Sequence, residues 1–387
     1  MLLAASTACH EAAPPPPPPA RPPPPPLGPA QVQVAFPEGV GDPAGWAKDL
    51  LAAFSDAGLV PDATRVCGVV AVLQQESGFQ ADPPVPNLGA LVRTRLEEEA
   101  RKYGPLGPAA MNRLLKDRAP GDRRTFEQRM RRLRTERELD LLFRDMLEAE
   151  RREHPAMVAT ANLLDTVFRG RRLEDLNPVT TAGSMQVSVR WAVDYAHTRG
   201  WPDGEEAVRD ALYTRAGGLR FGVPRLWGYP LTDADPLYRF ADYNAGQYAS
   251  RNAAVQRALA QLTGLPLAAD GDLLLIGPDG RPTAEDSETL RAFRVFRDRF
   301  VPTLPEARLR QDLEKGKELA FEETPSYLAL RRIWRERTGN ALPAAAVPAL
   351  ELKSPKLRQG YSTAAYARNV LRHHRACLQR LRGAAPE

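Results

Sequence analysis

A glutamate stands where an apolar helix is predicted to stop. Apolar side chains recur between Val66 and Leu73 at the i, i+3, i+4, i+7 spacing of a buried helix face, and Glu76 falls at the flank of that face. Ser77 and Gly78 follow directly, and glycine commonly ends a helix. A carboxyl group half-buried among apolar neighbours favours its neutral form, so its pKa rises. Such a group can hold a proton near neutral pH and act as a general acid; a solvated helix end is the other interpretation.

Two later segments carry side chains suited to sugars. The stretch "AGSMQV" contains Met185 and Gln186, and the stretch "DYNAG" contains Tyr243 and Asn244. Amides form directional hydrogen bonds with hydroxyl and N-acetyl groups, and aromatic rings offer flat apolar faces. The same residues also fit packing, for Met185, or a simple turn, for Asn244 and Gly246.

The order of the three segments resembles the lysozyme-like lytic transglycosylases of bacterial cell walls. In that family a helix ends in Glu-Ser, a Gly-x-Met-Gln segment follows and opens a helix, and a Tyr-Asn-Ala-Gly segment opens another. The resemblance implies Glu76 as the catalytic acid/base, cleavage of the MurNAc-GlcNAc bond of peptidoglycan glycan strands with 1,6-anhydro-muropeptide products, and no metal or cofactor. It assigns substrate contacts to Ser77, Met185, Gln186, Tyr243 and Asn244.

The chain departs from the family pattern after the glutamate. The interval between Glu76 and Gly183 is far longer than in the family, which requires a helical insertion over about 81–179. Loop closure costs little more as a loop lengthens, so a folded insert is tolerable. Glycosidases normally use two carboxylates. Asp82 and Asp242 are the candidates for the second by their place in the sequence alone.

The elements that must position these residues are predicted to be helices. We expect a mostly α fold: a lysozyme-like core of goose type or transglycosylase type over 36–264, the insertion, and a mainly helical region over 265–387 packed on the core. Residues 237–263 are predicted to be helical. The stretch "DLLLIGPDGRP" is the one clear strand-turn signal.

The N-terminus indicates export and anchoring. The stretch "MLLAASTAC" resembles a truncated signal ending in a bacterial lipobox, which implies a lipid at Cys9. A Pro-rich segment over 10–35 is predicted to be a disordered linker, and its polyproline part could span ~60 Å. These features predict a periplasmic lipoprotein anchored in the outer membrane. The alternative for the first nine residues is a disordered N-terminus without a signal. The alternative for the Pro-rich segment is a ligand for a recognition domain.

Charge and cysteine content limit the kinds of ligand that the chain is expected to bind. The chain has 387 residues, a net charge of +5 and only three cysteines, without the clustering that a zinc site needs. Arginines gather in 118–152 and 368–382, which we interpret as solvated helix faces, so nucleic acid is not an expected partner. With Cys9 lipidated, Cys67 and Cys377 could form a disulfide worth about 4–5 kcal/mol, or Cys67 could be a buried thiol.

The whole chain also resembles a family of uncharacterised proteobacterial lipoproteins, through the segment "LPAAAVPALELKSPKLRQGYSTAAYARNVLRHHRACL". That resemblance implies one architecture over about 36–382 and adds no activity. A non-catalytic peptidoglycan-binding or scaffolding lipoprotein is therefore the alternative function. The side chains of Trp191, Trp201 and Trp227 could be sugar platforms or core residues.

Overall fold

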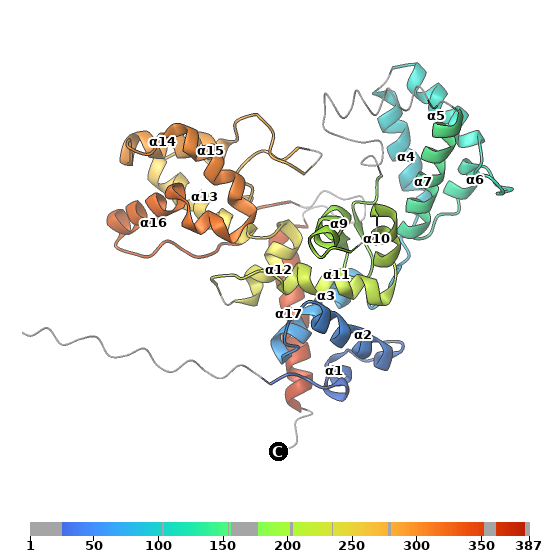
Figure 1. Ribbon diagram of the computed structural model, residues 1–387, viewed down its shortest axis with the longest axis horizontal. Helices are drawn as coiled ribbons and strands as arrows, with labels where there is room; N and C mark the ends of the chain where they lie inside the picture. Colours follow the sequence, from blue (N-terminus) through green and yellow to red (C-terminus); the bar gives the residue numbers. More distant parts are fainter. Residues whose placement is uncertain are drawn as a thin grey trace, which may run out of the picture.

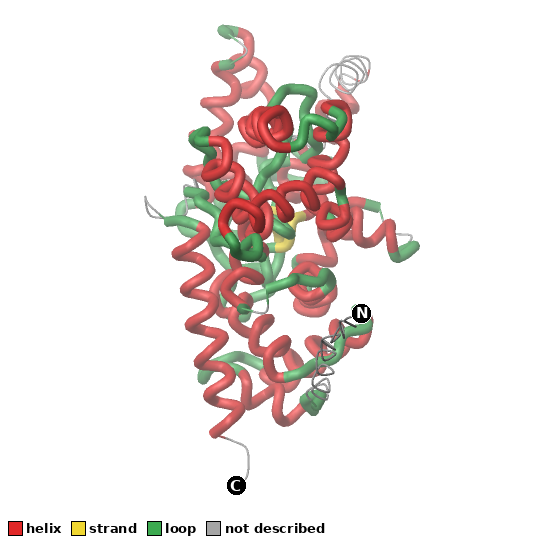
Figure 2. The backbone as a smooth tube through the Cα atoms, turned by 90° about the vertical axis from the view of Figure 1, so that its left-hand side faces the viewer, coloured by secondary structure: helices red, strands yellow, loops and turns green. Residues whose placement is uncertain are grey.

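The computed structural model describes residues 25–383 apart from 103, 154, 156–176, 202–203, 234, 278–279 and 352–360. The described part is mostly helical, with loops between the helices, as Figures 1 and 2 show. Its one sheet is a two-stranded antiparallel hairpin, β1 (Thr181–Ala182) and β2 (Val187–Ser188). The predicted mostly α fold class is confirmed at this level. The lipidation candidate Cys9 and most of the Pro-rich segment lie outside the described residues.

The helices form a central body with a lobe on either side (Figure 1). The central body contains α1 (Pro29–Ala35), α2 (Pro43–Asp56), α3 (Ala63–Glu76), α9 (Val189–Thr198), α10 (Glu205–Leu212), α11 (Arg215–Trp227), α12 (Pro236–Ala245) and α17 (Thr363–Gly383). The insertion lobe contains α4 (Leu88–Arg101), α5 (Leu106–Lys116), α6 (Phe126–Met130) and α7 (Glu136–Glu153). The other lobe contains α13 (Ala249–Thr263), α14 (Glu288–Phe300), α15 (Glu306–Glu314), the 3-10 turns η2 (Lys315–Lys317) and η3 (Leu319–Glu323), and α16 (Pro325–Thr338).

Helix α3 lies at the centre of the molecule and is buried on every side. All eight residues from Val66 to Leu73 are buried, rather than one stripe of them. Neighbouring helices cover each face, α17 most extensively and α11 and α1 with fewer contacts. Gly68 allows the closest approach, because a Cβ there would lie 2.5 Å from Cζ2 of Trp227. Four valines and a leucine in a helical stretch that is buried all round are typical of a core element.

The folded region begins earlier than predicted. Residues 29–35 form α1 instead of the end of a disordered linker, and Val32 and Ala35 are fully buried. The guanidinium of Arg380, near the end of α17, donates a hydrogen bond of 2.8 Å to the carbonyl of Ala35. Burial of these two apolar side chains therefore orders residues 29–35, although they directly follow the Pro-rich stretch.

The region after residue 264 is not a single extension of the core. Helices α13 to α16 share a hydrophobic core of their own, whereas α17 returns to the central body and packs along α3. The predicted helical stretch over 237–263 consists of two helices, α12 and α13, separated at Gly246, whose φ of 111° is in the region that favours glycine. The predicted strand-turn is present as a short hairpin in which the amide of Thr283 donates to the carbonyl of Leu275 at 2.8 Å.

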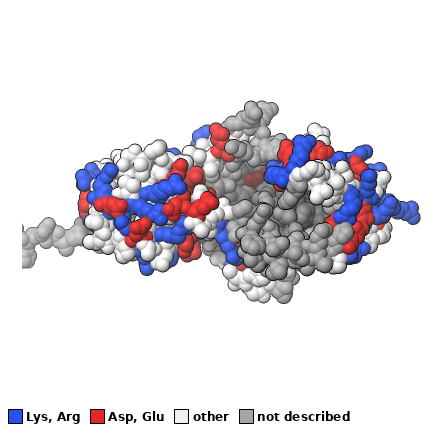
Figure 3. All heavy atoms as spheres, turned by 90° about the horizontal axis from the view of Figure 1, so that it is seen from above, with Lys and Arg blue, Asp and Glu red and all other residues white. Residues whose placement is uncertain are grey.

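The insertion shares the core of the central body. Leu115, Phe126 and Met130 belong to the same buried cluster as the residues of α3. On the face shown in Figure 3, basic and acidic side chains are interspersed over both lobes instead of being gathered by sign. Among the described residues, no helix combines the length and the apolarity that crossing a bilayer requires.

Candidate functional site

Glu76 is the last residue of α3, and the local sequence explains why the helix ends there. The amide of Ser77 donates to the carbonyl of Leu73 at 3.1 Å, and Gly78 takes the left-handed conformation with φ 59°. The hydroxyl of Ser77 donates to the same carbonyl and accepts from the amide of Gln80. Ser77 is buried at this helix end, so its hydroxyl serves the turn that presents Glu76.

The carboxyl of Glu76 holds its proton near neutral pH. Burial raises the pKa of Glu76 to about 7, and the negative charge of Glu136 acts in the same direction. The hydroxyl of Tyr366 donates to Oε1 of Glu76 at 2.5 Å, which favours the charged form and partly opposes this rise in the pKa. A carboxylic acid that titrates near pH 7 is suited to both halves of general acid/base catalysis.

Tyr366 reaches Glu76 because α17 runs antiparallel to α3. A disulfide joins Cys67, near the start of α3, to Cys377, in the second half of α17, with their Cα atoms 5.5 Å apart. At the other end of the pair, Tyr366 meets Glu76. The disulfide and the hydrogen bond thus fix the two ends of the contact between α3 and α17. Through this contact the long C-terminal helix, visible in Figure 2, places Tyr366 in the candidate site.

The Gly-x-Met-Gln segment forms the turn between β1 and β2 instead of opening a helix; α9 begins after β2. The amide of Gln186 donates to the carbonyl of Gly183 at 3.0 Å, and Gln186 itself has a φ of 49°. Gly183 combines a φ of 78° with a close approach, because a Cβ there would lie 2.0 Å from the carbonyl oxygen of Leu212. The turn therefore requires glycine at its first position.

Gln186 faces the insertion. Its Nε2 donates to a carboxylate oxygen of Glu136 at 2.9 Å, and its Oε1 accepts from the hydroxyl of Thr181 at 2.9 Å. Glu136 is the first residue of α7 and is buried. The insertion thus supplies a second carboxylate whose charge acts on Glu76. The sequence offered Asp82 and Asp242 as candidates for the second carboxylate, but the structure brings Glu136 to this position instead.

The Tyr-Asn-Ala-Gly segment ends α12 rather than opening a helix. The hydroxyl of Tyr243 donates to the backbone carbonyl of Met185 at 2.7 Å, which ties this segment to the turn. Burial raises the pKa of the Tyr243 phenol, and the charge of Glu76 adds to the rise, so Tyr243 is protonated at neutral pH. Asn244 accepts a hydrogen bond of 2.8 Å from the hydroxyl of Thr363, at the start of α17.

Met185 does not line a groove, because its side chain is fully buried. It packs against Gly222 of α11, where a Cβ would lie 2.1 Å from its sulfur. Met185 therefore contributes through its carbonyl, which holds Tyr243, and through the core that supports the turn.

The two aspartates named from the sequence have different places. Asp242 is fully buried and accepts hydrogen bonds from the amides of Ser250 and Tyr248, so it holds the connection between α12 and α13. Burial raises the pKa of Asp82, and a hydrogen bond from Thr135, the neighbour of Glu136 in the sequence, partly opposes this rise. No described hydrogen bond joins either aspartate to Glu76.

Sequence reasoning missed Tyr366 and Glu136. Tyr366 sits in "STAAYARNV", and its place on the buried face of a helix is a signal for burial but not for a partner. Glu136 lies in a strongly charged segment, where nothing separates it from its solvated neighbours. No cluster of potential metal ligands occurs among the residues that the structure describes.

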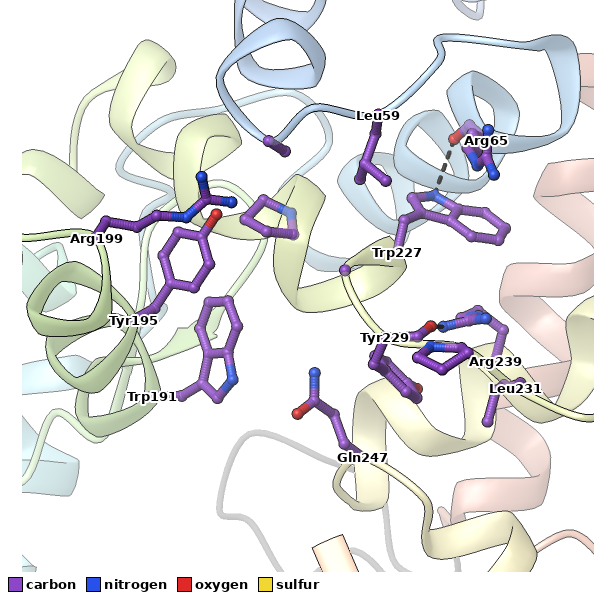
Figure 4. A pocket seen from close by; sticks show the side chains of 14 residues that line it. Leu59, Arg65, Trp191, Tyr195, Arg199, Trp227, Tyr229, Leu231, Arg239 and Gln247 are labelled. Carbon is purple, nitrogen blue, oxygen red and sulfur yellow. Dashed lines mark hydrogen bonds between the residues drawn. The ribbon is translucent and has the colours of Figure 1, made fainter. Parts of the chain in front are cut away.

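A pocket of about 590 Å³ lies elsewhere in the central body, and two of the three tryptophans named from the sequence, Trp191 and Trp227, line it (Figure 4). None of Glu76, Gln186 and Tyr243 is among its lining residues. The third, Trp201, packs edge-on against Phe221, with the guanidinium of Arg220 over its ring at 3.5 Å.

Residues 39–380 match the model of a family described as "Protein of unknown function (DUF1615)". The chain belongs to this family. The match includes every residue of the candidate site, from Glu76 to Tyr366. The DUF1615 chain is also similar to the "Uncharacterized protein YaiW" of Escherichia coli strain K12, with 36% identity over 352 residues that cover 90% of this chain and 88% of the relative. No solved structure matches this DUF1615 chain significantly.

Proposed function

We propose that the protein is a lytic transglycosylase-like enzyme with a lysozyme-like core, which cleaves the MurNAc-GlcNAc bond of peptidoglycan with Glu76 as its single catalytic acid/base. The observation that carries the proposal is the half-buried carboxyl of Glu76, whose pKa is raised to about 7 by burial and which accepts a hydrogen bond from Tyr366. The convergence of the turn at Gln186 and the end of α12 on the same region supports it, through the bond from Tyr243 to the carbonyl of Met185.

The reaction uses one proton and no cofactor. Glu76 gives its proton to the glycosidic oxygen while the bond from that oxygen to C1 of the muramic ring breaks. The resulting carboxylate takes the proton of the C6 hydroxyl, whose oxygen attacks C1 and closes a 1,6-anhydro ring. Nucleophile and electrophile belong to one substrate, which removes the entropic cost of bringing in water.

The neighbouring side chains have roles that follow from their positions. Tyr366 and Glu136 set the proton affinity of Glu76 in opposite directions. The amides of Gln186 and Asn244 are proposed to exchange their internal partners, Glu136 and Thr363, for sugar hydroxyl or N-acetyl groups. Tyr243, protonated and buried beside Glu76, is proposed to orient the leaving sugar.

A non-catalytic peptidoglycan-binding lipoprotein is the second candidate. It is favoured by the internal hydrogen bonds of Gln186 and Asn244, since amides already paired within the protein are not displayed for a substrate. In both cases we propose a periplasmic protein anchored in the outer membrane by a lipid at Cys9. Palmitate incorporation that persists in Cys9→Ala would contradict the anchor.

The activity test uses purified protein and isolated sacculi, with products analysed by mass spectrometry. Release of 1,6-anhydro-muropeptides by the natural protein and none by Glu76→Gln is the expected result. Retention on sacculi without release by either protein identifies the binder. Release of products with reducing ends, abolished in Glu136→Gln, would instead mean that the second carboxylate activates water and that the enzyme is a hydrolase.

A further inference from the structure

The pocket in Figure 4 lies at the opposite end of α3 from Glu76. Arg65, in the first turn of α3, lines the pocket, and Glu76 ends that helix. A rise of 1.5 Å per residue separates the two positions by about 16 Å. The pocket has a volume of about 590 Å³, which is in the range of pockets that bind small molecules.

Two aromatic walls face each other across the pocket. Trp191 and Tyr195, from α9, are stacked with their ring centroids 5.0 Å apart and their planes at 13°. Trp227 and Tyr229, from the end of α11 and the segment that follows, form the opposite wall, and Gln247 lies between the walls (Figure 4). The indole of Trp227 is fixed by a hydrogen bond of 3.1 Å to the carbonyl of Arg65.

An arginine accompanies each aromatic ring. The guanidinium carbon of Arg225 lies 5.5 Å from the ring centroid of Trp191, and that of Arg199 lies 5.2 Å from Tyr195. Arg239 lies over both rings of the opposite wall, at 5.1 Å from Trp227 and 4.4 Å from Tyr229. Cation–π contacts of this kind hold the rings in a defined orientation.

The charge of the pocket has one sign. Arg65, Arg199 and Arg239 line it, and no aspartate or glutamate is among the described residues that do. Arg65 is paired with Asp62, and Arg239 donates to the backbone carbonyls of Leu226 and Tyr229. Arg199 forms no ion pair with any carboxylate in the described part of the chain, so its guanidinium can donate hydrogen bonds to an anionic ligand.

Flat apolar ring faces, one amide and an excess of guanidinium groups together fit one ligand chemistry. Sugar rings stack their C–H faces on indole and phenol rings, an amide binds hydroxyl or N-acetyl groups, and a guanidinium binds a carboxylate in two places. We propose that this pocket binds an acidic carbohydrate, a sugar ring that carries a carboxylate. The proposal does not use Glu76 and stands apart from the proposed function.

The test compares matched sugars by saturation-transfer NMR titration of the full chain. N-acetylmuramic acid and N-acetylglucosamine differ by the lactyl carboxylate, and glucuronic acid and glucose differ by the carboxylate at C6. At least one acidic sugar is expected to bind ten times or more tightly than its neutral counterpart. The first pair points to a cell-wall sugar and the second to a uronic acid. Equal affinity within both pairs, or binding by benzoate but by neither acidic sugar, overturns the proposal.

Variants assign the binding to the pocket. Arg199 is exposed, so Arg199→Gln leaves the fold intact and is expected to reduce the preference for the acidic sugar to threefold or less. Trp191→Ala is expected to lower the affinity for both members of a pair at least fivefold. Trp334→Ala, on α16 in the other lobe, is the matched control and leaves binding unchanged, as does Glu76→Gln. Acidic-sugar binding that survives both pocket variants, or that is lost with Glu76→Gln, rejects the site.

Discussion

Tyr366 donates its phenolic proton to Oε1 of Glu76 across 2.5 Å, although the two residues are 290 positions apart in the sequence. Burial raises the pKa of Tyr366 well above its usual value, and the charge of Glu76 adds to the rise, so the phenol is a permanent donor at physiological pH. The acid at the end of α3 is therefore tuned by the last helix of the chain.

Removing that donor should raise the pKa of Glu76. In Tyr366→Phe the charged form of Glu76 loses a hydrogen bond, and burial then acts unopposed by it. We expect the titration of Glu76, followed by NMR of protein labelled with 13C at the glutamate carboxyl, to move from about pH 7 to a higher pH. Tyr327→Phe, on α16, is the control. A titration that moves down, or stays fixed, contradicts the assigned role.

Neutralising Glu136 should lower the pKa of Glu76. The negative charge of Glu136 disfavours a second charge nearby, and Glu136→Gln removes it while leaving an oxygen that can accept from Gln186. The same NMR titration is expected to shift in the direction opposite to that of Tyr366→Phe. If the enzyme is active, the alkaline limb of its pH profile moves with the titration in both variants, because the reaction begins from protonated Glu76. Limbs that move in the same direction would count against this site.

The stability of the protein should fall as Glu76 ionises. Its pKa is raised from 4.5 when unfolded to about 7 when folded, so its contribution is fully present below pH 4.5 and is lost as pH rises through 7. In Glu76→Gln this loss is absent. The free energy of unfolding of the natural protein relative to Glu76→Gln is thus expected to drop by about 3 kcal/mol between pH 4 and pH 8. Urea unfolding at a series of pH values measures it, and a constant difference would falsify the raised pKa.

Breaking the disulfide should weaken both the fold and the site. The bond closes a loop of 310 residues and holds α17 against α3, so Cys67→Ala with Cys377→Ala is expected to lower the free energy of unfolding by about 3–5 kcal/mol. Because Tyr366 is positioned by the same helix pair, the titration of Glu76 in the folded double variant should move in the direction of Tyr366→Phe. A variant as stable as the natural protein, under oxidising and reducing conditions alike, contradicts the structure at this bond.

The sequence by itself determined the local features of this protein. Periodicity and Gly78 predict that α3 ends at Glu76, and the helix-forming character of most segments predicts the mostly α fold, because helix formation and helix ends depend on neighbours within a few residues. The same local reasoning could name Gln186, Tyr243 and Asn244 as polar groups at predicted helix boundaries, and it could name Cys67 and Cys377 without deciding whether they pair.

Only the tertiary structure decided which of these groups meet. It buried Met185 against Gly222, used Asp242 to hold the turn after α12, and brought Glu136 from the insertion and Tyr366 from the last helix to the acid at the end of α3. The physical reason is that such pairs depend on which helix faces pack together. That choice minimises the exposed apolar surface of the whole chain, and no spacing within a single segment records it.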